Sequence, residues 1–159
     1  MSNQPPRVSA GRIILTVVAL FTAISPFVFD WNETHIYNPA WPPHAKFHNA
    51  QTMVLGAFLG LLTLYCTWFR KSVSLKQSLN EAVCIAALYW LSQFPAIMFP
   101  GTMLTDPSGN HLQPPMLFGL IEFNQLTMDL LIVLPLIAAS YFLEARRLSH
   151  LNSVVSSAA

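Results

Sequence analysis

The chain has 159 residues, of which 53% are hydrophobic and only 9% are charged. Ordinary soluble domains carry about 25% charged residues, so this composition excludes a typical soluble domain and indicates a membrane protein. The formal net charge of +1 leaves no surplus of basic residues for phosphate groups, which excludes a nucleic-acid partner.

Four apolar stretches are long enough to cross a bilayer, which takes about 20 mostly apolar residues. They cover residues 13–29, 50–69, 81–100 and 117–143. They predict one domain, an all-α, integral membrane four-helix bundle. The segments 30–49 and 101–116 are predicted to be the two loops at one end of this bundle, because turn-forming residues interrupt the apolar pattern there.

Basic residues are distributed unequally between the two ends of the spans. Only Lys46 lies in the two loops just named, and seven lie at the opposite ends: Arg7, Arg12, Arg70, Lys71, Lys76, Arg146 and Arg147. Because Lys and Arg are enriched on the cytoplasmic side, both termini are predicted to be cytoplasmic, with loops 30–49 and 101–116 outside. This orientation fits the endoplasmic reticulum and a bacterial inner membrane equally well.

Polar residues gather at the predicted outer ends. Four of the five histidines lie there, namely His35, His44, His48 and His111. The pair Pro42-Pro43 is typical of a helix start, where a missing N–H is tolerated. His44 and His48 then lie four residues apart on one helix face, which we expect to point into the bundle.

The fourth span carries a stripe of polar residues. Glu122, Gln125 and Asp129 fall within about 60° of arc if this span is one helix, with Asp129 roughly 10 Å below the outer interface. An aspartate at the centre of a spanning helix costs about 2.5–3.5 kcal/mol, so such residues usually mark function. Burial disfavours its charged form, and a neutral acid next to an imidazole makes a proton donor–acceptor pair.

These groups predict a site at the outer lip of the bundle. The predicted catalytic residues are Asp129, Glu122, His48, His44 and Glu33. The predicted substrate-binding residues are Gln125, Gln93, Trp90, Trp41 and Asn49.

Two stretches resemble known membrane proteins. The run HIYNPAWPPHAKFHNAQ, from His35 to Gln51, resembles a loop of small four-helix membrane proteins of unassigned function. The element Gln93-Phe94-Pro95 and the run LTMDLLIVLPL (126–136) are similar to the sterol-isomerase-related four-helix membrane domains. The second resemblance implies an acid–base bundle that handles sterol-like lipids. The histidine–glutamate pattern of those domains is not reproduced here, so no catalytic residue is carried over.

The sequence favours a small integral membrane enzyme that performs acid–base chemistry on a lipophilic molecule. Isomerisation, cyclisation or hydration of a terpenoid or sterol-like substrate suits a buried acid with a base nearby. No cofactor is expected for this chemistry, and the expected partners are membrane lipid and the lipophilic substrate.

Two alternatives rest on other features of the sequence. HxxxH at a helix start is a spacing that binds zinc or iron, with a ligand set of His44, His48, Glu33 and His35. A non-enzymatic lipid-binding or accessory subunit is the other alternative. In that case the GxxxG pair Gly56 and Gly60 offers a close-packing face for a homodimer.

Overall fold

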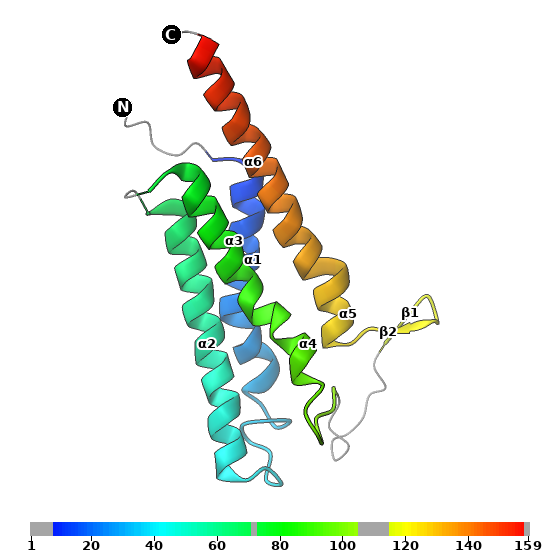
Figure 1. The fold of residues 1–159 in the computed structure, drawn as a ribbon. Coiled ribbons are helices and arrows are strands. Elements are labelled where there is room, and N and C mark those ends of the chain that lie inside the picture. Colours follow the sequence, from blue (N-terminus) through cyan, green and yellow to red (C-terminus); the bar gives the residue numbers. More distant parts are fainter. Residues whose placement is uncertain (1–7, 71–72, 105–114, 158–159) are drawn as a thin grey trace.

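Four long helices lie side by side and account for most of the chain (Figure 1). The computed structural model describes residues 8–70, 73–104 and 115–157. The long helices are α1 (Ala10–Asp30), α2 (Pro43–Trp68), α3 (Leu75–Leu91) and α6 (Leu134–Ser157). The short elements are α4 (Gln93–Ala96), β1 (Met116–Leu117), β2 (Ile121–Glu122), α5 (Gln125–Met128) and the π-helix η1 (Asp129–Val133). The four-helix prediction is therefore confirmed for the bundle, with a small β-hairpin added.

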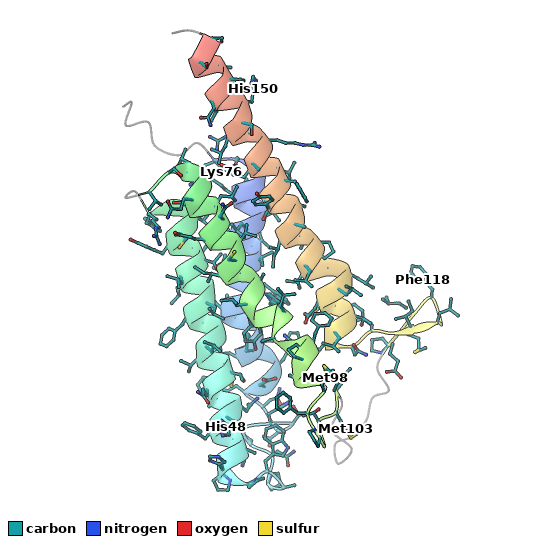
Figure 2. The ribbon with its side chains drawn as sticks, in the orientation of Figure 1. His48, Lys76, Met98, Met103, Phe118 and His150 are labelled. Carbon is teal, nitrogen blue, oxygen red and sulfur yellow. The ribbon has the colours of Figure 1, made fainter. Side chains whose placement is uncertain are left out.

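The two ends of the bundle carry different elements and different residues. At one end, which we call the basic end, α1 begins, α2 leads into α3 and α6 finishes (Figure 1). The loop 31–42 and α4 lie at the opposite end, which we call the loop end (Figure 1). Lys76 and His150 lie at the basic end, and His48, Met98 and Met103 lie at the loop end (Figure 2).

The core lies between α1, α3 and α6. It is centred on Trp90, which is only 2% exposed and stacks on Phe21 with ring centroids 5.4 Å apart. The indole Nε1 donates a hydrogen bond to the Thr22 hydroxyl at 2.9 Å, so the buried polar atom of the ring is satisfied. Leu15 and Ile137 pack into the same cluster.

Small residues let α1 approach α2 closely. A Cβ on Gly60 would overlap the Ala19 carbonyl oxygen, and one on Gly56 would lie 2.9 Å from the Thr22 carbonyl oxygen. The GxxxG pair is therefore used inside the chain, as small residues are at membrane helix contacts. A homodimer stays a prediction, but Gly56 and Gly60 face α1 and are not free to form it.

A buried ion cluster joins three helices at the basic end. The Glu144 carboxylate lies 2.6 Å from Arg147 Nη1 and 3.9 Å from Arg12 Nε, and it accepts a hydrogen bond from the Ser9 hydroxyl. Arg12 also donates to the Thr67 carbonyl oxygen at the end of α2. The side chains of Arg12 and Glu144 are only 10% and 5% exposed. This cluster fixes where α1, α2 and α6 meet.

The predicted third span, 81–100, is wrong as a single helix. The helix α3 ends at Leu91, and α4 follows as a separate turn. Pro95 explains the break, since it has no N–H to donate to the Leu91 carbonyl and its ring clashes with that group. Among the described residues, three helical stretches are long and apolar enough to cross a membrane: Ala10–Asp30, Pro43–Trp68 and Gln125–Val154.

The predicted fourth span, 117–143, begins and ends elsewhere in the structure. Residues 116–122 form a hairpin, with Phe118 and Gly119 in its turn at positive φ. The helix begins after Asn124, whose side chain accepts from the Thr127 N–H at 3.1 Å in a capping box. It continues past residue 143 to Ser157. Glu122 therefore lies on an exposed strand and not on the helix stripe predicted for it.

Candidate functional site

A cavity of about 370 Å³ opens at the loop end, between α1, α3, α4 and α5. The end of α1, the break between α3 and α4, and the start of α5 meet here, which places polar side chains beside apolar ones. The apolar lining comes from Pro26, Phe29, Trp90, Leu104, Phe123 and Met128. The polar lining comes from Ser25, Asp30, His35, Tyr89, Gln93, Asn124 and Gln125. We call this space the loop-end cavity.

An acid–base pair forms part of its wall. Asp30 is the last residue of α1, and its carboxylate Oδ1 lies 4.0 Å from His35 Nδ1. The other carboxylate oxygen accepts a hydrogen bond from Asn49 Nδ2 at 2.9 Å, which ties the end of α1 to α2. The side chains of Asp30 and His35 are 23% and 32% exposed, so both can meet a molecule in the cavity.

The loop after α1 brings this histidine back to the helix end. The Ile36 N–H donates to the Asp30 carbonyl oxygen at 3.3 Å, which closes the turn. The Thr34 hydroxyl lies 2.7 Å from His35 Nδ1, and the Trp41 ring meets the His35 ring edge-on at 4.9 Å between centroids. Two predicted binding residues, Trp41 and Asn49, therefore act on the cavity indirectly, because they hold His35 and Asp30 in place.

Gln93 lines the cavity at the break between α3 and α4. Both polar atoms of its side-chain amide are buried, and neither has a hydrogen-bond partner among the residues that the structure describes. Trp90, from the last turn of α3, and Gln125, the first residue of α5, line the same cavity. Three of the five predicted substrate-binding residues therefore share one space.

Asp129 lies deeper than the cavity. Its side chain is fully buried, and in the described part of the chain neither carboxylate oxygen has a hydrogen-bond partner. It begins the π-helix η1, where the Leu134 N–H reaches back to the Asp129 carbonyl oxygen. Pro135, which has no N–H for the preceding turn, explains this widening of the helix, and such π-turns are frequent at functional sites. The neighbouring Met128 lines the cavity.

The two histidines of α2 lie elsewhere. His44 and His48 are exposed, with their Nε2 atoms 3.0 Å apart, and His48 Nδ1 lies 3.2 Å from Gln51 Oε1 (Figure 2). The prediction that this face points into the bundle is wrong. The buried face of α2 consists of Met53, Gly56, Gly60, Thr63, Cys66 and Thr67. The structure therefore does not bring the imidazoles of His44 and His48 to the buried Asp129.

Other predicted residues also lie outside the cavity. Glu33 is exposed in the loop after α1, and Glu122 is exposed on the hairpin. His111 lies outside the described residues. Within those residues, no three His, Cys, Asp or Glu side chains are close enough to hold a metal ion. The ligand set of His44, His48, Glu33 and His35 is therefore not assembled in this structure.

Sequence reasoning missed the pairing of His35 with Asp30 and the place of Tyr89 in the cavity. His35 was predicted at the outer end and as a candidate metal ligand, but its pairing with Asp30 depends on the return of the loop after α1, which no periodic pattern reveals. Tyr89 was missed because it stands next to the more conspicuous Trp90, and it lines the cavity together with Asp30.

Residues 14–153 match a family model described as a family of unknown function (DUF6640). No curated protein and no solved structure matches the chain.

Proposed function

The chain belongs to the DUF6640 family of unknown function, and we propose that it is an integral membrane enzyme that performs acid–base chemistry on a lipophilic molecule. The substrate class is terpenoid or sterol-like, and the reaction is an isomerisation, cyclisation or hydration. The observation that carries this proposal is the pair Asp30–His35 on the wall of the loop-end cavity. Carboxylate and imidazole are the side chains most often used to move protons in catalysis.

Placement in a membrane is supported by the three long apolar helices. The basic end carries Arg12, Arg70, Lys76, Arg146 and Arg147, which favours a cytoplasmic position for that end. The loop-end cavity then lies near the opposite surface of the bilayer.

The cavity suits a molecule with an apolar body and a small polar group. Its volume of about 370 Å³ lies at the lower end of the range of roughly 300–1,000 Å³ for ligand sites. Phe29, Trp90 and Met128 offer apolar contacts, while Asp30 and His35 face the same space. In an isomerisation, one member of the pair gives a proton to one carbon of the substrate and the other removes a proton from a second carbon. The hydrogen bond from Asn49 keeps the carboxylate in place for this exchange.

Deuterium exchange tests this proposal whatever the identity of the lipophilic substrate. Purified protein is incubated in D₂O with a lipid extract from membranes of the source organism, and deuterium gained by each lipid is measured by mass spectrometry. We expect the wild type to label at least one lipophilic compound, and Asp30→Asn and His35→Gln to lower that labelling by about 10²–10⁴-fold. Glu81→Gln is the matched carboxylate-to-amide control, since Glu81 lies at the basic end and pairs with Arg70. Labelling that is absent from the wild type, or unchanged in Asp30→Asn, contradicts the proposal.

A second candidate function, a non-enzymatic lipid-binding or accessory subunit, is favoured by a different observation. Large apolar side chains stand free at the loop end and on the hairpin: Met98 is 82% exposed, Leu120 83% and Phe118 96% (Figure 2). Such side chains fit contact with lipid or a partner beyond the bundle. A lipid that co-purifies in a one-to-one ratio and gains no deuterium would favour this candidate over the enzyme.

A further inference from the structure

Gln93 stands apart from the other amide groups at the loop-end cavity. The Asn124 side-chain oxygen Oδ1 accepts a hydrogen bond from the Thr127 N–H in the N-cap of α5, and Gln125 lies exposed at the start of that helix. Gln93 alone among these three has both amide atoms buried and without a partner in the described part of the chain. A buried amide that makes no hydrogen bond is costly, so native proteins nearly always satisfy it.

The charge around the cavity limits what can satisfy this amide. Among the described residues that line the cavity, Asp30 is the acidic one, and none is Lys or Arg. An anionic head group, such as a phosphate or a carboxylate, would be repelled by the Asp30 carboxylate, and His35, the one group of the described lining that can become cationic, already lies beside that carboxylate. A neutral hydroxyl meets no such penalty, and it can accept from the amide Nε2 or donate to Oε1.

We propose that the loop-end cavity binds a lipophilic alcohol, whose hydroxyl group hydrogen-bonds to the Gln93 amide. The hydrocarbon body packs against Phe29, Trp90 and Met128, the apolar part of the lining. The hydroxyl is then held in the space that Asp30 and His35 share. This inference names the substrate class of the proposed site; it rests on that site but not on the reaction proposed there.

Paired probes test this assignment in the full-length protein. The affinities of farnesol, of farnesene, which lacks the hydroxyl, and of farnesoic acid are measured by quenching of tryptophan fluorescence in detergent, since Trp90 lines the cavity. We expect the wild type to bind farnesol roughly 3–10-fold more tightly than farnesene, the effect of one neutral hydrogen bond, and farnesoic acid least tightly. Gln93→Leu should bind farnesol and farnesene within about 2-fold of each other.

The controls separate this inference from the proposed reaction. Gln51→Leu removes an exposed glutamine of α2 outside the cavity and should keep the wild-type preference. Unchanged farnesene binding by Gln93→Leu shows that this variant is folded; if it is not folded, Gln93→Met provides the same test. The inference is overturned if the wild type binds farnesol and farnesene equally, or binds neither. It is also overturned if the folded Gln93 variant still prefers farnesol to farnesene. A preserved preference with no deuterium exchange refutes the reaction alone.

Discussion

Replacing Glu144 with glutamine is expected to lower the free energy of unfolding by about 3–5 kcal/mol, the usual cost of removing one partner from a buried ion pair. The variant keeps the shape of the side chain but removes its charge. Arg12, whose side chain is 10% exposed, then loses its counter-ion while Arg147 stays nearby. At about 2–4 °C per kcal/mol for a chain of this size, the thermal midpoint should fall by roughly 6–20 °C. Circular dichroism in detergent measures it.

The matched control separates burial from distance. Glu81 lies 2.7 Å from Arg70, closer than the 3.9 Å between Glu144 and Arg12, but the Glu81 and Arg70 side chains are 29% and 31% exposed. Because this half-buried pair is open to solvent on one side, and solvent-exposed pairs contribute about 0–1 kcal/mol, Glu81→Gln should shift the midpoint by much less than Glu144→Gln, by no more than a few degrees. The double variant Arg12→Leu/Glu144→Leu should recover most of the loss, since the buried Arg12 charge is removed, and Arg147, which also loses Glu144, is 25% exposed and can meet solvent. Equal losses for Glu81→Gln and Glu144→Gln would refute this reasoning.

Three further variants test the fold and the site. Asp129→Asn keeps the side-chain volume nearly constant and removes a buried ionisable group whose oxygens have no hydrogen-bond partner among the described residues. We therefore expect the thermal midpoint to rise by roughly 2–4 °C. A lower midpoint would contradict this. Gly60→Ala should lower the free energy of unfolding by about 1–3 kcal/mol in a denaturant titration, because the alanine Cβ would meet the Ala19 carbonyl oxygen. This loss should outweigh the better helix propensity of alanine. Unchanged stability would show that α1 and α2 can separate freely. The double variant His44→Ala/His48→Ala should label lipids with deuterium within about 2-fold of the wild type, since this exposed pair lies outside the cavity. A loss similar to that of Asp30→Asn would place the site on α2 instead.

The number of helices could be predicted from hydropathy, but two helix bounds could not. The apolar run from Leu117 to Ile121 reads equally well as strand or helix by periodicity alone. Two local signals mark the true boundary: Gly119 at positive φ in the hairpin turn, and Asn124 three residues before Thr127 in a capping box. Pro95 is a comparable signal inside the third apolar run, where it ends the continuous helix.

The inward face of α2 was mispredicted because polarity alone is a poor guide to which face of a helix is buried in this bundle. His44 and His48 were expected inside since polar groups avoid lipid. The structure instead buries the small residues Gly56 and Gly60, which let the backbones of α1 and α2 touch. His44 and His48 lie in the first turns of α2, where an exposed histidine can meet water, so its position carries little cost.

The members of the loop-end cavity were predicted unevenly. Gln93, Trp90 and Gln125 were selected because they lie near predicted helix ends on one side, and the structure places all three on one cavity. Asp30 and His35 come together through a loop conformation fixed by backbone hydrogen bonds, which leaves no periodic trace in the sequence. The burial of Asp129 was predicted correctly, since it depends only on position within a long apolar run.

The most direct test of the central claim is to locate where a lipophilic alcohol binds. A photoactivatable diazirine analogue of farnesol is cross-linked to the protein in detergent, and the labelled residues are identified by mass spectrometry. We predict labelling at the cavity lining, within residues 25–35, 89–93 and 123–128, and its suppression by excess farnesol. Labelling confined to the exposed face of α2 around His48, or labelling that farnesol does not suppress, would contradict the account.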